Sequence, residues 1–328
     1  MAKKRILSVG LGFMGQNHSR NILKSKTMEI AGIVDVIAPN LALKKSAGNL
    51  ALEPFPEDVL ASVPYFSDLK KAIAEVKPDA VLIATPTMFH HEYGMIALEA
   101  GCNIFMEKPL CINLDHCDEL VRVAAEKHLV FMTGLCVRFS PEFQFLKNAV
   151  EKKPYGKAQF VHFSRHSGVP VWGCWAEPEV ARTSGGAMFD LAIHDTDCAR
   201  ALFGNPDELC MQPFLRERFG LQAIDSIWRY KDGTLVRVEA DFLEPPSLPF
   251  HREFTAIFET ASLVCDMSGM KLCDKDGVHE IKLEAIDPYA AELDAFAGYL
   301  EKGEMPMECS GADATASVRI CHRYFNYK

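Results

Sequence analysis

Short hydrophobic runs alternate with amphipathic stretches over the first third of the chain. The runs predict buried strands at Arg5–Val9, Met28–Val34, Ala80–Ala84, Asn103–Met106 and Val130–Thr133. Helical patterns lie between them, at Gly15–Ser25, at Asp68–Val76 and from the N-cap candidate Asn113 to about Lys127. Strands that alternate with helices are typical of a parallel α/β sheet, and we predict one here.

The pattern changes after about residue 135. Longer strands are predicted at Lys157–Arg165, Ala223–Tyr230, Thr234–Phe242 and Glu253–Phe258. Asp232-Gly233 predicts a tight hairpin between two of them, and Pro288–Lys302 predicts a helix that Gly303 ends. We therefore expect an α/β protein in two domains. Residues 1–128 form a dinucleotide-binding domain, and residues 129–328 form an α+β domain with a large, mostly antiparallel open sheet.

Composition and charge narrow the function classes. The chain has 328 residues and a net charge of −9, without a long run of either sign. Such a surface argues against a nucleic-acid partner. No apolar stretch is long enough to span a membrane, and no signal-peptide cleavage pattern follows the basic start. The 11 cysteines lack zinc or disulfide spacing and fit reduced core positions. We expect a cytoplasmic protein without a membrane partner.

A glycine-rich segment follows the first predicted strand and opens the first predicted helix: Gly10-Leu11-Gly12-Phe13-Met14-Gly15. In this pattern the first glycine permits a tight turn, the second lets backbone approach a pyrophosphate, and the third lets helix and strand pack closely. The N-terminus of the helix offers N–H groups to the phosphates. We expect Gly10, Gly12, Phe13, Met14 and Gly15 to bind a dinucleotide, as in a Rossmann domain.

Asp35 ends the second predicted strand, near the offset at which an acidic residue binds the ribose hydroxyls. An anion there repels a 2′-phosphate, and the residues that follow, Val36, Ile37 and Ala38, supply no arginine to receive one. NAD is therefore favoured over NADP as the cofactor. The alternative is an aspartate that only caps a turn before Pro39.

A second candidate site lies in the segment from Ser184 to Asp197. If it is a loop entering a regular helix that runs to about Leu202, Asp190, His194 and Asp197 share one face, and Asp195 points elsewhere. A histidine between carboxylates can act as a general base near neutral pH, which alcohol oxidation requires. An ordinary pair on a helix surface is the alternative.

Two further segments follow predicted strands at their carboxyl ends, where open α/β sheets bind ligands. Glu107-Lys108-Pro109 follows one strand, and Lys108 could hold a substrate oxygen there. Thr85, Pro86 and His90 follow the neighbouring strand, next to the expected nicotinamide position. No group of histidines has the spacing of a metal site, and we expect no metal in the reaction.

These segments, taken in order along the chain, resemble the Gfo/Idh/MocA family of oxidoreductases, and the inositol-dehydrogenase-like branch most. The resemblance implies a catalytic trio at Lys108, Asp190 and His194, with His194 as the base. It also implies cofactor contacts near Thr85, Pro86, His90, Glu107 and Lys108, a cis bond before Pro109, and homodimers or homotetramers.

Substrate contacts are the least determined part. Arg138 follows the last strand of the first domain, where the family often presents an arginine. His162, Ser164 and His166 share one face of a predicted strand, facing either solvent or a cleft. Trp172 and Trp175 lie in one loop and could form a wall for a sugar ring or a glycoside, or pack in the core. We predict Arg138, His166 and Trp172 as substrate contacts.

The resulting prediction is an NAD-dependent dehydrogenase that oxidises a ring secondary alcohol of a sugar, cyclitol or glycoside to a ketone, or catalyses the reverse. An NAD-dependent glycosidase that oxidises its substrate transiently is the enzymatic alternative. A non-catalytic NAD(P) or sugar sensor is the alternative of another class.

Overall fold

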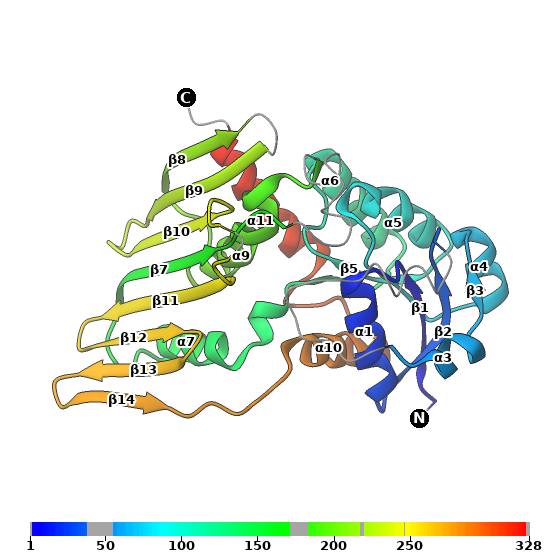
Figure 1. Cartoon of the computed structure of the whole chain (residues 1–328), viewed down its shortest axis with the longest axis horizontal. Helices are drawn as coiled ribbons and strands as arrows, with labels where there is room; N and C mark the ends of the chain where they lie inside the picture. The colour runs from blue at the N-terminus through cyan, green and yellow to red at the C-terminus, as the bar shows by residue number, and fades with distance from the viewer. Residues whose placement is uncertain (1, 38–54, 171–182, 217–219, 246, 326–328) are drawn as a thin grey trace. The chain divides into compact units, whose positions relative to one another are not determined.

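The computed structural model describes residues 2–37, 55–170, 183–216, 220–245 and 247–325. Their backbone contacts divide the chain into two compact units (Figure 1). The first contains Met1–Cys136 and Tyr289–Ala316, and the second contains Val137–Pro170, Ala181–Pro288 and Ser317–Lys328. The first unit is thus discontinuous in sequence, since the chain returns to it near residue 289. None of the described helices is long and apolar enough to cross a membrane.

A parallel six-stranded sheet forms the centre of the first unit, in the order β3-β2-β1-β4-β5-β6. Its strands are β1 (Lys4–Val9), β2 (Met28–Val34), β3 (Tyr65–Phe66), β4 (Ala80–Ile83), β5 (Asn103–Glu107) and β6 (Phe131–Gly134). This is the Rossmann strand order, and its direction of winding reverses between β1 and β4. The predicted parallel sheet is confirmed, and the two-residue strand β3 is the one that the hydrophobic pattern missed.

Helices of the first unit connect these strands. They are α1 (Phe13–Lys24), α3 (Glu57–Ser62), α4 (Leu69–Val76), the 3₁₀ turn η1 (Thr87–Phe89), α5 (His90–Glu99), α6 (Leu114–Glu126) and α10 (Pro288–Lys302). Asp68 and Asn113 cap α4 and α6 through their side chains, as their positions predicted. Phe296 of α10 packs on Phe105 of β5 with ring centroids 5.5 Å apart, which explains why this late helix belongs to the first unit.

The second unit contains an eight-stranded sheet in the order β14-β13-β12-β11-β7-β10-β9-β8. Its strands are β7 (Ala158–His166), β8 (Glu208–Arg216), β9 (Gly220–Arg229), β10 (Leu235–Asp241), β11 (His251–Phe258), β12 (Ala261–Asp266), β13 (Gly269–Asp274) and β14 (Gly277–Ile281). Only the β7–β10 pair is parallel among the described pairs, so the predicted mostly antiparallel sheet is confirmed.

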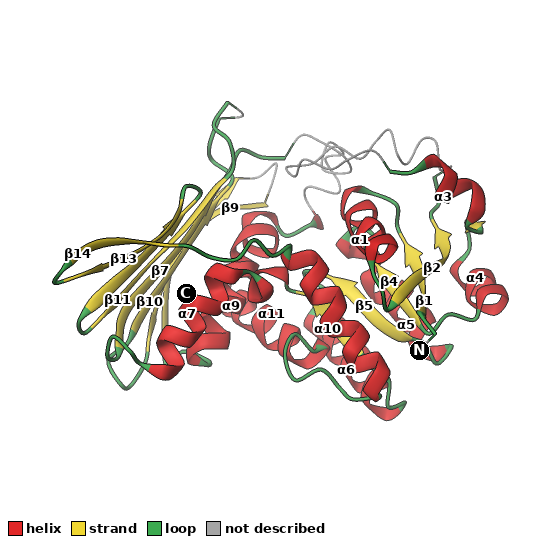
Figure 2. Cartoon of the chain, turned by 90° about the horizontal axis from the view of Figure 1, so that it is seen from below, coloured by secondary structure: helices red, strands yellow, loops and turns green. Residues whose placement is uncertain are grey.

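Helices cover one face of this sheet. The second unit adds the 3₁₀ turn η2 (Cys136–Phe139), α7 (Pro141–Lys152), the π-helical turn η4 (Met188–Ala192) and α9 (Ile193–Phe203), and α11 (Gly311–Phe325) begins in the first unit and ends in the second. Figure 2 shows α7 and α9 on one side of the strands and none of the described helices on the other. One face of the sheet is therefore open within the described part of the chain.

Candidate cofactor and catalytic residues

The glycine loop between β1 and α1 has the geometry that the sequence predicted. Gly10 has a φ of +89°, and a Cβ there would lie 2.7 Å from the carbonyl oxygen of Ala84 at the end of β4. A Cβ on Gly15 would lie 1.8 Å from the carbonyl oxygen of Gly10. Around Gly12, by contrast, no described atom beyond Gly12 itself and its two chain neighbours lies within 4 Å of the Cβ position. The open side of Gly12 is where a pyrophosphate can approach the backbone.

The start of α1 is suited to an anion. Gly12 is its N-cap and provides no side-chain cap, and the first turn carries no acidic residue. Its first N–H groups and the helix dipole therefore remain available to phosphate oxygens. Asp35, just after β2, accepts hydrogen bonds from the N–H of Leu11 at 2.7 Å and of Ile37 at 2.9 Å. Each carboxylate oxygen can accept a further hydrogen bond, so Asp35 can still bind ribose hydroxyls.

His90 connects the segments that follow β4 and β5. Its Nε2 lies 2.9 Å from the carbonyl oxygen of Thr85, and its Nδ1 lies 3.0 Å from that of Pro109 and 3.1 Å from that of Leu110. The side chain is buried, which lowers the pKa of His90 although the three carbonyl groups act in the opposite direction. This geometry gives His90 a positioning role, and its predicted contact with the cofactor stays a prediction.

Glu107 and Lys108 stand at the end of β5. The Lys108-Pro109 bond is cis, as the family resemblance implied. Glu107 accepts a hydrogen bond from the N–H of Lys108 at 3.0 Å, and its Oε1 lies 2.5 Å from Nε2 of the buried His18 on α1. Burial raises the pKa of Glu107, but the hydrogen bond and charge of His18 outweigh it, so the pKa lies below its usual value. Sequence reasoning missed His18, whose signal is a polar residue on the buried face of α1.

The predicted helix around His194 is wrong in its first part. Met188–Ala192 form a π-helical turn, and the regular helix α9 begins only at Ile193. A π turn is wider than an α-helical turn, so Asp190 and His194 do not align as an i, i+4 pair of an α-helix. Both side chains are half-buried. Such turns occur often at functional sites, and this one carries Asp190, while His194 lies in the first turn of α9.

Two aspartates of α9 form buried ion pairs. Asp197 accepts two hydrogen bonds from Arg138 of η2, each of 2.6 Å, and one from Ser317 at 2.7 Å. Asp195 accepts one from Arg165 of β7 at 2.7 Å. Arg138 is therefore an anchor of α9, and its predicted contact with substrate stays a prediction.

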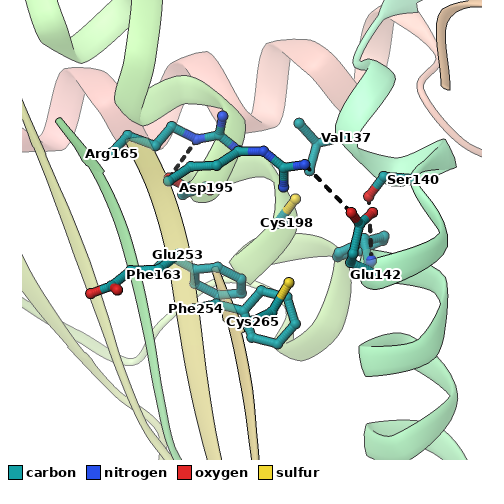
Figure 3. Close-up of a pocket in the computed structure, with 12 residues that line it drawn as sticks. Val137, Ser140, Glu142, Phe163, Arg165, Asp195, Cys198, Glu253, Phe254 and Cys265 are labelled. Carbon is teal, nitrogen blue, oxygen red and sulfur yellow. Dashed lines mark hydrogen bonds and ion pairs between the residues drawn. The ribbon is translucent and has the colours of Figure 1, made fainter. Parts of the chain in front are cut away.

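A small cavity of about 20 Å³ lies beside the Arg165–Asp195 pair. Figure 3 shows Arg165 directed at Asp195, with Cys198, Cys265 and Phe254 on the other walls. The volume is close to what one water molecule needs. This cavity cannot receive a sugar ring, and the packing around α9 is accordingly tight.

His166 lies on the other face of β7 from Arg165, because successive side chains of a strand alternate. Its Nδ1 is 2.6 Å from Oδ2 of Asp241 at the end of β10. The hydrogen bond that His166 donates to Asp241 raises the pKa of His166, and this effect is larger than the opposing effect of burial. Trp172 and Trp175 lie outside the described residues.

Comparisons with known proteins fit this architecture. Residues 4–135 match the sequence model of the Gfo/Idh/MocA family described as an oxidoreductase family with an NAD-binding Rossmann fold. Residues 143–264 match the model of the Gfo/Idh/MocA C-terminal domain.

Relatives include scyllo-inositol 2-dehydrogenase (NAD(+)) of Bacillus subtilis, 25% identical over 96% of this chain and 91% of that protein. The 2,7-anhydro-N-acetylneuraminate hydratase of Mediterraneibacter gnavus is 29% identical over 62% of this chain and 50% of its own length. Two further relatives are matched over only 53% and 56% of their lengths, so for these proteins the chain spans about half of the relative.

A solved structure with the same fold is UDP-N-acetylglucosamine 3-dehydrogenase from Acidithiobacillus ferrooxidans. It has a TM-score of 0.79 and 21% identity, and the match covers 99% of this chain and 97% of that one. Because both family domains match in order and the sheet of the first unit has the Rossmann strand order, this chain belongs to the Gfo/Idh/MocA family, and residues 4–135 form its NAD-binding Rossmann domain.

Proposed function

We propose that this chain is an NAD-dependent oxidoreductase that oxidises a ring secondary alcohol of a sugar, cyclitol or glycoside to a ketone, or catalyses the reverse. The observation that carries the proposal is the loop between β1 and α1, where Gly12 leaves open space in front of an uncapped helix N-terminus. The named activity of the scyllo-inositol dehydrogenase, which matches nearly the whole chain, supports the substrate class.

The loop residues Gly10, Gly12, Phe13, Met14 and Gly15 would hold the pyrophosphate of the dinucleotide, and Asp35 would bind the adenosine ribose. The charge of Asp35 at that position favours NAD over NADP, because a 2′-phosphate there would meet a carboxylate that already accepts two backbone N–H groups. When bound, NAD supplies the acceptor for the hydride.

Three side chains would perform the proton chemistry. His194 would accept the proton of the substrate hydroxyl, and Asp190 would orient the ring of His194. Lys108 would donate a hydrogen bond to the same oxygen and stabilise its negative charge. The hydrogen bond from the N–H of Lys108 to Glu107 supports this role, since it fixes the backbone from which the lysine extends. Thr85, Pro86 and Glu107 are proposed to border the nicotinamide, with His90 holding their segments together.

A second candidate function is net non-redox chemistry, such as the cleavage of a glycoside by transient oxidation. The specific observation that favours it is the hydratase among the relatives, because a hydratase by its name adds or removes water without net oxidation. Both functions need NAD and a base, so their sites use the same residue types.

The experiment mixes purified protein and NAD with a panel of cyclitols, aldoses and glycosides and follows the absorbance of NADH. We expect NADH to accumulate with at least one compound of the panel and not in the Lys108→Ala variant. Release of an aglycone or of water without NADH would favour the second function. If the protein binds NAD but forms neither NADH nor a released aglycone, the non-catalytic sensor becomes the favoured function.

We also propose that the chain forms a homodimer or homotetramer through the open face of the eight-stranded sheet. Ile227, Leu235 and Ile257 support this, because each is more than a third exposed on that face. None of the described cysteines forms a disulfide, which supports the proposal that the protein works in the reducing cytoplasm.

A further inference from the structure

A histidine and two carboxylates converge at one end of the eight-stranded sheet; none of them belongs to the proposed catalytic trio, and His166 is also a predicted substrate contact. One nitrogen or oxygen atom from each of His166, Asp241 and Glu244 lies within 4.8 Å of the other two. We propose that these side chains bind a divalent transition-metal ion, with Zn²⁺ as the preferred ion.

Strand pairing brings the first ligands together. His166 of β7 is paired with Asp241 of β10 on one side and with His251 of β11 on the other. Directly paired residues project from the same face of a sheet, so the three side chains form one row. The ring centroids of His166 and His251 are 4.9 Å apart. His251 is therefore a neighbour of the site, while the atoms that lie within 4.8 Å of one another come from His166, Asp241 and Glu244.

Glu244 joins this row because of the turn that follows β10. The N–H of Leu243 donates to Oδ1 of Asp241 at 2.9 Å, while Oδ2 faces His166. The N–H of Glu244 donates to the carbonyl oxygen of Ser167 at 3.3 Å. These bonds fix the segment after β10 beside the end of β7, and they hold the second carboxylate near the first.

The chemistry of the group fits zinc. Imidazole nitrogen and carboxylate oxygen are ordinary zinc ligands, at about 2.0–2.2 Å from the ion. Bound zinc would replace the proton that His166 and Asp241 share and would offset the charge of two neighbouring carboxylates. The side chains of His166 and Asp241 are 17% and 16% exposed, so an ion can reach them from solvent.

A similar group in the first unit lacks this access to solvent. His18, Glu107 and Glu292 also bring three such atoms within 4.8 Å of one another. The side chains of His18 and Glu107 are, however, 0% and 7% exposed, and Glu292 is buried as well. We assign the ion to the accessible group only.

The test measures zinc bound by the full chain after treatment with a chelator, by equilibrium dialysis against Zn²⁺ with Mg²⁺ present as a competitor. We expect one zinc ion per chain at the site. His166→Ala and the isosteric Asp241→Asn should each weaken zinc binding by about 10- to 100-fold or more, because each removes a direct ligand.

His162→Ala is the matched control. His162 lies on the same face of β7, and its Nε2 is 3.1 Å from Glu239, but Arg237 also contacts that carboxylate at 3.1 Å and would repel a cation. This variant should bind zinc as the parent protein does. The proposal is overturned if the parent binds no zinc above a protein-free blank. It is also overturned if His166→Ala and Asp241→Asn bind zinc as the parent does, which would assign the ion to the cysteine thiols instead. Unchanged NAD binding and circular dichroism establish that each variant is folded.

Discussion

Gly12 and Gly15 belong to one glycine-rich segment but have opposite surroundings, so substitutions at the two positions separate an effect on cofactor binding from an effect on folding. Space around Gly12 is open, whereas a Cβ on Gly15 would collide with the carbonyl oxygen of Gly10. Gly12→Val should therefore leave the fold intact and displace the pyrophosphate. Losing a charge-assisted hydrogen bond costs about 1.5–3 kcal/mol, so NAD should bind roughly 10- to 100-fold more weakly.

Gly15→Ala is the contrasting variant. Its methyl group must move α1 away from β1, and such overpacking costs about 1–3 kcal/mol of unfolding free energy. Thermal melting and NAD titration by calorimetry measure the two effects separately. Gly12→Val with the NAD affinity of the parent protein would refute the proposed position of the pyrophosphate.

His194 is the residue on which the proposed proton transfer depends. If it is the general base, His194→Ala should lower turnover by roughly 10²–10⁴-fold. NAD affinity should not change, because the nucleotide-binding residues belong to the Rossmann domain. Steady-state rates of NADH formation with the best compound of the panel provide the measurement. Turnover equal to that of the parent protein would remove His194 from the mechanism.

At the scale of elements, the ion pair between Arg138 and Asp197 fastens η2 to α9. Both side chains are buried, at 6% and 2% exposure, and two hydrogen bonds join them. Removing one partner leaves a buried charge, so Arg138→Ala should lower the free energy of unfolding by about 3–5 kcal/mol. Urea denaturation measures this loss. The double variant Arg138→Met with Asp197→Leu should recover part of it.

The same variants distinguish anchoring from substrate binding. If Arg138 is only an anchor, the double variant should recover the KM of the parent protein as its stability recovers. A direct contact with substrate predicts a raised KM in the double variant even where stability has recovered.

His90 joins the segments after β4 and β5, and its burial makes this junction sensitive to pH. Because its pKa is lowered in the folded state, the folded chain binds fewer protons than the unfolded chain just below the usual histidine pKa. Stability from His90 is therefore present near neutral pH and decreases as the pH falls. His90→Gln should cost about 1–3 kcal/mol at neutral pH, since it leaves buried carbonyl groups without donors.

Below the usual histidine pKa, the difference in unfolding free energy between the parent protein and His90→Gln should shrink. Urea denaturation of both at pH values on either side of it provides the comparison, and the other histidines cancel because both proteins contain them. A difference that stays constant with pH would mean that His90 does not titrate in this range.

Local sequence signals predicted the parts of the fold that depend on neighbouring residues. The hairpin at Asp232-Gly233 and the cap at Asn113 are examples, since a turn or cap forms among residues a few positions apart. The glycine loop was also predicted, because its function follows from the backbone of a single strand, turn and helix. The parallel first sheet was predicted from the alternation of helix and strand.

Long-range contacts explain what the sequence did not reveal. The π turn at Met188–Ala192 interrupts a stretch whose composition is that of an ordinary helix. The ion pairs of Arg138 and His166 were not predicted, because their partners, Asp197 and Asp241, stand 59 and 75 positions away. The strands β12, β13 and the edge strand β14 have only five or six residues each, and their alternation is too brief to predict a strand.

At the scale of the whole molecule, we expect the open face of the eight-stranded sheet to form the interface of the proposed homo-oligomer. Phe160, Leu235 and Ile257 stand in one row across β10, β7 and β11. Ile227 of β9 lies in the next row on the same face, paired with Arg237. An exposed apolar row of this kind is typical of a surface that a partner covers. In a homodimer with two-fold symmetry, the same row of each copy would meet its counterpart.

Leu235→Glu tests this assembly because the position is 37% exposed and lies outside the core of the chain. In a symmetric interface the substitution places two carboxylates near one another in an apolar contact, which should cost several kcal/mol through desolvation and like charge. We expect the parent protein to elute as a dimer or tetramer in size-exclusion chromatography with light scattering, and the variant as a smaller species. Lys231→Glu, a charge change on the exposed hairpin before β10, is the control for charge alone and should keep the parent mass. If the parent is a monomer, or if Leu235→Glu keeps the parent mass, the open face is not the proposed interface. His166, Asp241 and Glu244, at the ends of β7 and β10, then become the first place to look for another use of this face.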